Sequence, residues 1–300
     1  MVVLIDPPLW PAHGTRFSHL VSDASLEELF AFADTNDVPI RAFDHDHYDV
    51  AERHHQELVA AGAAPVPATE LLRRLVAGGL RVRKPARTPR PQQVLPRLAA
   101  AWDRLLPGSA ALGRELLERW QEPHRHYHDV RHLAHALDAL AAISDGEPSR
   151  PVALALWFHD AVYAGSPGSD EERSAELAQA ELEAAGLPRA EVEEVHRLVL
   201  LTAGHSPEPG DHAGALVVDA DLAVLGQPPG RYHYYVRNVR LEHQQLPDPV
   251  FASGRLGVVE RLLSVQPLYR TPVGRRLWSG QARTNLDLEQ RRWRLVAPAK

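Results

Sequence analysis

Histidine and cysteine set the limits on the metal and nucleophile chemistry that this chain can perform. The sequence of 300 residues holds 17 histidines and no cysteine, and five of the histidines lie between His124 and His135. Without cysteine there is no thiolate nucleophile, no disulfide and no cysteine-ligated zinc site. Any transition-metal site must therefore be built from imidazole and carboxylate groups.

The histidine-rich segment has the spacing of one helical face. On a helix that begins near His128, His132 lies about 40° to one side of His128 and His135 lies about 20° to the other. Val130 and Leu133 then fall on the opposite side. A polar stripe that faces solvent is the simpler interpretation of this pattern, and metal ligation is the other.

A second segment carries the adjacent pair His159 and Asp160. The surrounding residues 151–163, PVALALWFHDAVY, are apolar almost all round, so this segment should be buried. A buried ionised carboxylate is strongly unfavourable unless it is paired or coordinates a metal. A divalent cation would satisfy both side chains, and a neutral His–Asp hydrogen bond at a helix end close to Gly165 and Pro167 is the alternative.

A third segment places Asp219 and Asp221 inside another apolar run, LVVDADLAVL, at residues 216–225. One of the two could be the N-cap of a helix that Gly226 ends. Two acids in one buried stretch are harder to explain in that way. Three separate segments therefore offer His, then His-Asp, then Asp, in that chain order.

This order of residues on a helical scaffold resembles the HD-domain superfamily of metal-dependent phosphohydrolases. In that superfamily the first His, the His-Asp pair and the last Asp bind a divalent metal. The resemblance assigns this metal-binding role to His132, His159, Asp160 and Asp221. The resemblance covers roughly residues 112–290. Within the superfamily, this part of the chain looks like an uncharacterised bacterial branch.

The sequence just before His132, the first expected ligand, is similar to a more specific motif. Tyr127-His128-Asp129, followed by His132, looks like the Tyr-His-Asn-x-x-His segment of cyclic nucleotide phosphodiesterases, with Asp129 in place of Asn. In those enzymes the earlier His is the proton donor. The resemblance therefore implies that His128 is the general acid.

Relatives with two metals hold the second ion with additional histidines. The residues of this chain that could bind a second metal or the substrate are His205, Asp170, Glu171 and Asp219. Asp170 stands where those relatives carry His, so we expect one tightly bound metal. Either Asp219 or Asp221 could be the ligand. The local sequence Ala-Asp-Leu favours Asp221.

The expected activity is hydrolysis of a phosphate ester in a nucleotide or another small phosphorylated metabolite. A divalent ion lowers the pKa of a bound water toward neutrality, Asp160 or Asp221 would help to orient that water, and His128 would protonate the leaving oxygen. The ligand set is compatible with Mn, Fe, Co, Ni, Zn or Mg. Arg125, Arg131 and Arg173 are candidates for phosphate binding, although each could equally be a surface arginine. The alternative function is a regulatory module that binds a metal or a nucleotide without catalysis.

The N-terminal segment has its own acidic and histidine side chains. Asp6 and Asp44 end the two expected strands, so both could meet at the C-terminal edge of a parallel sheet, joined by His13, His19, His45 and His47. We favour the interpretation that they are turn and capping residues. The stretches MVVLIDPPLWPAHGTRFSHLVSD and FDHDHYDV resemble a short bacterial domain of unknown function, which implies no activity.

These residues are distributed over two expected domains. Residues 84–96, KPARTPRPQQVLP, hold four prolines and three cations, which predicts a linker over 84–95 between a small α/β domain (1–83) and an all-helical domain of the HD type (96–300). The first domain should contain strands at 2–5 and 38–43 and helices at 25 onward, 51–61 and 68–77. The second should be helical near 97–106, 110–121, 128–143, 150–163, 171–185, 189–203, 216–225, 231–245, 254–264 and 272–294.

Charge and hydropathy exclude some partners. The formal net charge is −6, which argues against a nucleic-acid-binding surface and leaves a small phosphorylated molecule as the expected partner. The N-terminal MVVLIDPPLW has no basic region and too short an apolar run for a signal peptide, and no stretch approaches the length of a membrane span. We therefore expect a cytoplasmic protein.

Overall fold

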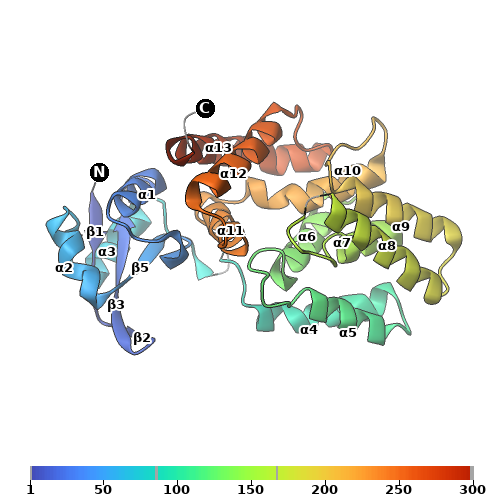
Figure 1. Ribbon diagram of the computed structural model, residues 1–300, viewed down its shortest axis with the longest axis horizontal. Coiled ribbons are helices and arrows are strands. Elements are labelled where there is room, and N and C mark those ends of the chain that lie inside the picture. The colour runs from blue at the N-terminus through green and yellow to red at the C-terminus, as the bar shows by residue number, and fades with distance from the viewer. Residues whose placement is uncertain (1, 85–86, 167, 298–300) are drawn as a thin grey trace. The chain divides into compact units, whose positions relative to one another are not determined.

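The computed structural model describes residues 2–84, 87–166 and 168–297, which form two compact units (Figure 1). The first unit consists of Met1–Arg87 together with Pro228–Leu241, and the second of Thr88–Gln227 together with Glu242–Lys300. Residues 85 and 86 of the expected linker, Pro167, and residues 298–300 of the expected helical domain lie outside the described residues.

The first unit is built on a sheet that is mostly antiparallel. Its strands are β1 (Val3–Ile5), β2 (Trp10–Ala12), β3 (Thr15–Ser22), β4 (Phe43–Asp44), β5 (His47–Ala51) and β6 (Ala64–Pro65). They follow the order β4-β5-β3-β1-β6, with β2 paired to β3. The β1–β6 pair is parallel and the other pairs are antiparallel, so the parallel sheet suggested by the sequence is wrong.

Two local signals in this unit explain where the sequence expectations fail. His13 and Gly14 have φ of 48° and 75°, which produces a tight β2–β3 hairpin and an antiparallel neighbour for β1. The expected strand at 38–43 is instead a 3₁₀ turn, η1 (Ile40–Ala42), followed by the two-residue β4. Pro39, whose φ is −69°, lacks an N–H for a sheet ladder at that point.

Helices cover both faces of the sheet because the strand side chains alternate. Ile5 packs in one apolar cluster with Leu29 and Phe30 of α1 (Leu26–Thr35), whereas Leu4 packs in the other with Leu71 of α3 (Ala68–Ala77). The unit also contains α2 (Glu52–Ala60). The N-terminus of α1 is capped as the sequence predicts, since the Ser25 hydroxyl accepts the Glu28 N–H at 3.1 Å.

Most of α11 (Pro229–Glu242) groups with the first unit, which the sequence does not predict. The His233 ring lies edge-on to Phe30 at 4.5 Å, and Tyr234 stacks on His45 at 4.1 Å between ring centroids. A Cβ at Gly230 would collide with the His45 carbonyl oxygen. The first unit therefore draws on a segment far along the chain, whereas the expected division placed all of 96–300 in one domain.

The second unit is mostly helical, and no strand is assigned after β6 among the described residues. Its elements are α4 (Pro91–Leu105), α5 (Ala110–Arg119), α6 (Val130–Ile143), α7 (Arg150–Phe158), α8 (Ser169–Ala184), α9 (Arg189–Leu201), α10 (His212–Asp221), the 3₁₀ helix η3 (Leu222–Gly226), α12 (Asp248–Ser264) and α13 (Pro272–Val296). Helix α4 begins inside the range expected as linker. Helix α6 begins after its N-cap Asp129, so His128 precedes the helix instead of lying on it.

Aromatic and aliphatic side chains of α4, α6, α7 and α10 form the interior of this unit. Trp102 meets Trp157 edge-on at 5.0 Å, and Leu133 and Val217 are fully buried. In Figure 1, α6 and α7 lie between α4 and α5 on one side and α12 and α13 on the other. Over the described residues, no helix combines the length and the apolar character needed to cross a bilayer.

Candidate metal centre

Three elements of the second unit bring four of the predicted side chains together. His132 comes from α6, His159 and Asp160 follow directly after α7, and Asp221 is the last residue of α10. The Nε2 atom of His132 lies 3.1 Å from Nε2 of His159 and 3.1 Å from Oδ1 of Asp221. Nε2 of His159 lies 3.2 Å from Oδ2 of Asp160. Two imidazole nitrogens and two carboxylates therefore converge on one point.

The end of α7 fixes the orientation of His159. Its backbone N–H donates to Ala155, and its Nδ1 lies 2.8 Å from the Leu156 carbonyl oxygen. Because a carbonyl oxygen can only accept, Nδ1 carries a proton, and loss of the second ring proton would leave the lone pair on Nε2. This is the tautomer that binds a metal through Nε2.

His132 is buried rather than solvent-facing, which rules out the polar-stripe interpretation for this residue. Its ring is flanked by Tyr127 at 4.8 Å and by Trp120 at 6.1 Å between centroids. Its Nδ1 has no hydrogen-bond partner within the described residues, so the Nε2 contacts to His159 and Asp221 account for its polar environment.

The charges of this cluster reinforce one another. Burial by itself would raise the pKa of Asp160, but the adjacent His159 outweighs it and holds that pKa well below its usual range. Asp221 behaves in the same way, since hydrogen bonds to His132 and His159 overcome its burial and lower its pKa. Burial would lower the pKa of His159, yet the two carboxylates raise it well above 6.5. Both carboxylates are therefore ionised and attract positive charge.

The residues present fit a divalent metal ion. One donor atom from each of His132, His159 and Asp221 lies within 4.8 Å of the others, and Oδ2 of Asp160 is 3.7 Å from Nε2 of His132. Two imidazoles and two carboxylates form a mixed nitrogen and oxygen set that suits first-row divalent metals. These four side chains could hold the ion.

His205 also reaches this cluster, from the loop after α9. Its Nε2 lies 2.7 Å from Oδ2 of Asp221, the oxygen that does not face His132. The backbone of His205 has a φ of 51°, an uncommon conformation for a residue other than glycine. Of the side chains considered for a second ion, His205 is the one that lies against the cluster.

Glu242 is the site residue that sequence reasoning missed. Its Oε1 accepts the backbone N–H groups of His126, Tyr127 and His128 at 2.7–2.8 Å, and its Oε2 lies 2.8 Å from Nδ1 of His128. The Tyr163 hydroxyl donates to the same Oε2 at 3.1 Å. No spacing could have found this residue, because it lies 114 positions from His128 at the end of a segment with no acidic motif.

Glu242 also changes the protonation of His128. Burial would lower the pKa of His128, but the Glu242 carboxylate outweighs this effect and raises it above 6.5. The same pair lowers the pKa of Glu242 to about 2, against the effect of its burial. His128 keeps 24 % of its side chain exposed, and its Nε2 has no hydrogen-bond partner among the described residues. Glu242 therefore favours the protonated form of His128 beside the cluster.

Asp219 lies outside the cluster and has a structural role. Its Oδ1 accepts the Arg270 N–H at 2.7 Å, and its Oδ2 accepts both the N–H and the hydroxyl of Thr271 at 2.7 Å. Thr271 in turn caps α13 by accepting the Gly274 N–H. Both oxygens of Asp219 are thus engaged at the N-terminus of α13, and the structure does not bring this carboxylate to the cluster as a second ligand.

Asp170 and Glu171 are likewise occupied at the start of α8. Oδ2 of Asp170 accepts the N–H groups of Ala164 and Ser166 at 2.9 and 2.8 Å, and Glu171 accepts the Gly168 N–H at 2.6 Å. These bonds order the loop before α8. Neither carboxylate contacts the His132 cluster in the hydrogen bonds and ion pairs of the described residues.

Two of the three arginines predicted to bind phosphate are engaged elsewhere. The buried Arg125 guanidinium donates to the carbonyl oxygens of His128 and Asp160, so it braces the two ligand segments against each other. Arg131 pairs with Asp129 at 2.7 Å. Arg173 is exposed on α8. The sequence motif shows the cation of Arg125 but not the carbonyl oxygens that engage it.

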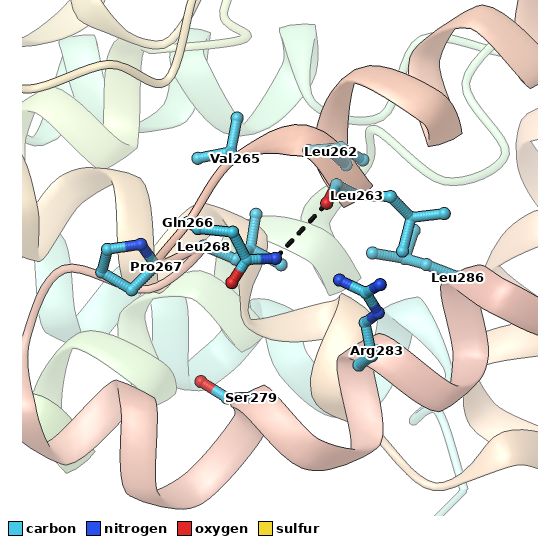
Figure 2. Close-up of a pocket in the computed structure, with 9 residues that line it drawn as sticks. All are labelled: Leu262, Leu263, Val265, Gln266, Pro267, Leu268, Ser279, Arg283 and Leu286. Atoms are coloured by element: carbon cyan, nitrogen blue, oxygen red, sulfur yellow. Dashed lines mark hydrogen bonds between the residues drawn. The ribbon is translucent and has the colours of Figure 1, made fainter.

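A separate pocket of about 340 Å³ lies between the end of α12 and α13 (Figure 2). Its lining is Leu262, Leu263, Val265, Gln266, Pro267, Leu268, Ser279, Arg283 and Leu286. The Gln266 amide donates to the Leu263 carbonyl oxygen at 3.4 Å. None of the clustered histidines or aspartates lines this pocket, so its mainly apolar wall is distinct from the candidate metal centre.

In the first unit the acidic and histidine side chains pair in a way that differs from the expectation. Asp6 contacts His19, with Oδ2 2.9 Å from Nδ1, whereas Asp44 contacts His45 at 2.5 Å. Asp6 and Asp44 thus do not share one ligand set. His13 lies in the β2–β3 turn.

Comparison with known proteins gives one match, confined to the first unit. Residues 3–78 match the family described as "Protein of unknown function (DUF4031)". This supports an N-terminal domain of unknown function, as the sequence resemblance implied. No curated protein and no solved structure matches the chain.

Proposed function

We propose that the helical unit is a metal-dependent phosphohydrolase of the HD type that acts on a small phosphate ester. The observation that carries this proposal is the convergence of His132, His159, Asp160 and Asp221 from three separate elements. A protonated His128 held beside them by Glu242 supplies the acid that ester hydrolysis needs. Metal binding and proton transfer are thus assigned to different residues.

The chain's own groups divide the work of hydrolysis. A divalent ion in this centre would supply a Lewis acid that makes water nucleophilic near neutral pH. Nε2 of His132 and of His159 would hold it, and Asp160 and Asp221 would balance its charge. Asp160 would also accept a hydrogen bond from the attacking water and so orient it. Because carbonyl oxygens engage Arg125 and Asp129 pairs with Arg131, we assign contact with the phosphate to His128.

His128 is placed to protonate the leaving oxygen. Its Nδ1 is committed to Glu242, so the proton available for transfer is on Nε2. Glu242 also accepts three backbone N–H groups of the same segment, which fixes the position of the His128 backbone. Glu242 is therefore a positioning residue for the acid.

The test combines metal analysis with a substrate screen on the full chain. The protein is dialysed against Mn, Co, Ni, Zn or Mg, its metal content is measured, and it is assayed with phosphomonoesters, nucleotides, cyclic nucleotides and cyclic dinucleotides. We expect His159→Ala to lose both metal and activity. His128→Ala should keep its metal and lose turnover by about 10²–10⁴-fold. His212→Ala, an exposed histidine on the same helix as Asp221, is the control and should match wild type.

Two other outcomes have a defined meaning. If wild type and Asp160→Ala bind the same amount of metal, the proposed centre is wrong. If the metal binds as expected, no ester is hydrolysed and nucleotides bind without turnover, the helical unit is a binding module and not an enzyme.

A further inference from the structure

We propose that the first unit contains a second, independent site for a first-row divalent transition metal, formed by His19, His47 and Asp49. It belongs to the segment that matches the family of unknown function, so it lies outside the phosphohydrolase proposal. One donor atom from each of the three side chains lies within 4.8 Å of the others.

The strand register places these three side chains on one face of the sheet. β3 and β5 are antiparallel, and His19 lies directly opposite Asp49. His47 precedes Asp49 by two positions on β5, so its side chain points to the same face. The cluster therefore forms from the cross-strand pair His19 and Asp49 and from His47, two positions away on β5, without any distortion of the backbone.

Each histidine has its Nδ1 held by a buried carboxylate. Nδ1 of His19 lies 2.9 Å from Oδ2 of Asp6, and Nδ1 of His47 lies 2.7 Å from Oδ1 of Asp46. Asp6 and Asp46 are both fully buried. Since a carboxylate accepts, the proton in each pair lies on Nδ1, and Nε2 is the ring nitrogen left to bind a metal. A carboxylate behind a histidine in this way is the usual support of a metal ligand.

The buried carboxylates are fixed in turn. Oδ1 of Asp6 accepts the backbone N–H of His19, so the carboxylate and the ring that it supports are tied to the same residue of β3. Oδ2 of Asp46 accepts the Val82 N–H at 2.6 Å, and Arg81 and Arg87 pair with its oxygens at 3.3 and 3.4 Å. The two imidazoles are thereby oriented before any ion binds, which reduces the entropy lost on binding.

Both Nε2 atoms face the third ligand. Oδ1 of Asp49 lies 3.5 Å from Nε2 of His47 and 4.0 Å from Nε2 of His19. The two imidazole rings are 5.0 Å apart between centroids at an angle of 77°, so their nitrogens approach from different directions. Two imidazoles and one carboxylate leave coordination positions open for water or a substrate.

The site is open to solvent on one side. The Asp49 side chain is 47 % exposed, whereas that of His47 is 9 % exposed, so an ion would enter past Asp49. Nitrogen ligands favour Mn, Fe, Co, Ni or Zn over Mg and Ca, which prefer oxygen.

A tryptophan beside the cluster provides a readout. The Trp10 ring lies 5.3 Å from the His19 ring, and Trp10 is the one tryptophan in residues 1–87. A paramagnetic ion such as Co²⁺ or Cu²⁺ at the site should quench its fluorescence. Comparing the full chain with Trp10→Phe isolates this signal from that of the other five tryptophans.

The experiment titrates the full chain with Co²⁺ and measures quenching of Trp10 and bound metal after dialysis. We expect a saturable component of the quenching in wild type that is lost in Trp10→Phe, where the quenching of Trp120 beside His132 and His159 remains. His47→Ala should lose about one bound ion per chain. Asp49→Asn changes an exposed side chain and is the variant least disturbing to the fold; its affinity should fall at least about 10-fold. His54→Ala, an exposed histidine of α2, is the control and should behave as wild type.

The two proposed sites can fail separately. His159→Ala should keep the Trp10 quenching and lose only the ion of the helical unit. If Trp10 is not quenched in wild type, or if His47→Ala and Asp49→Asn, folded by circular dichroism, bind Co²⁺ as wild type does, the site in the first unit does not exist. Neither result bears on the phosphohydrolase proposal.

Discussion

Two aspartates at positions 219 and 221 show how strongly a residue's role depends on its hydrogen-bond donors. Both lie on α10 in one apolar run, yet Asp219 accepts three hydrogen bonds at the start of α13, whereas Asp221 faces two imidazoles. Backbone donors fix a carboxylate in a structural role. Imidazole nitrogens leave it available to a cation.

This contrast predicts opposite effects for two matched substitutions. Asp221→Asn should lose the metal of the helical unit and, compared with wild type in chelator, keep most of its stability, because its partners are side chains. Asp219→Asn should keep the metal and lose about 1–3 kcal/mol of unfolding free energy, since one oxygen that accepts backbone N–H groups becomes a donor. Metal analysis and urea unfolding measure the two effects. Loss of metal in Asp219→Asn with full helical content would contradict the assignment.

Glu242 should matter to turnover and not to metal binding. In Glu242→Gln the charge that raises the pKa of His128 is lost, so His128 loses its proton at lower pH. In the proposed mechanism the rate depends on protonated His128, so it should fall at lower pH than in wild type, and kcat should drop at neutral pH. A pH–rate profile with metal analysis is the test. An unchanged basic limb would show that Glu242 only supports the fold.

At the scale of elements, α10 is held at both ends by side chains rather than by an apolar stripe alone. Asp211 caps its N-terminus by accepting the Gly214 N–H at 2.8 Å, and Arg197 of α9 donates to Asp211 at 2.7 Å. The other end delivers Asp221 to the candidate centre. Capping thus sets the position of the helix that presents the ligand.

The Asp211 cap predicts a stability that depends on pH. Hydrogen bonds from Arg197 lower the pKa of Asp211 below 3.8 in spite of its partial burial. A folded-state pKa below the unfolded value stabilises the protein above pH 3.8, and this contribution is lost as pH falls through the folded pKa. Asp211→Ala should therefore cost about 0.5–2 kcal/mol at pH 7 and less in acid.

Asp211→Asn separates the cap from the charge. Asparagine caps a helix about as well as aspartate, so this variant should lose only the partly exposed ion pair to Arg197, about 0–1 kcal/mol. Chemical denaturation at several pH values measures both variants. Equal losses for alanine and asparagine would show that the ion pair, and not the cap, holds α10.

At the scale of the whole molecule, the chain divides into two units with different ligand geometry. The first unit gathers its histidines on two adjacent strands, whereas the second gathers its ligands from α6, the end of α7 and α10. An ion bound by three elements that are far apart in sequence cross-links the helical unit. It should therefore contribute to the stability of that unit.

Metal removal tests this consequence. An ion at a hundredfold excess over its Kd should stabilise the native state by about 2.7 kcal/mol. Chelation should lower the Tm of wild type accordingly and leave the Tm of His159→Ala unchanged. In Trp10→Phe, thermal unfolding followed by tryptophan fluorescence reports on the helical unit, because the remaining tryptophans lie between Trp102 and Trp293. If chelation lowers the Tm of wild type and of His159→Ala by the same amount, the ion does not bind at this centre.

The sequence alone determined the residue types that were available and much of the local structure. The absence of cysteine restricted metal ligands to imidazole and carboxylate, and apolar periodicity predicted the helices near 171–185 and 272–294 within a few residues. Ser25 and the glycines at 78 and 79 marked helix ends correctly. These features depend on neighbours within one or two helical turns, which a single sequence displays directly.

Only the tertiary structure decided which of these residues act together. It separated Asp219 from Asp221, bound Arg125 to carbonyl oxygens and brought Glu242 to His128. It also paired β3 with β5 and so placed His19 opposite Asp49, where the sequence suggested turn residues. The reason is physical: the role of a polar side chain is set by the donors and acceptors around it, and those come from segments that are distant in sequence.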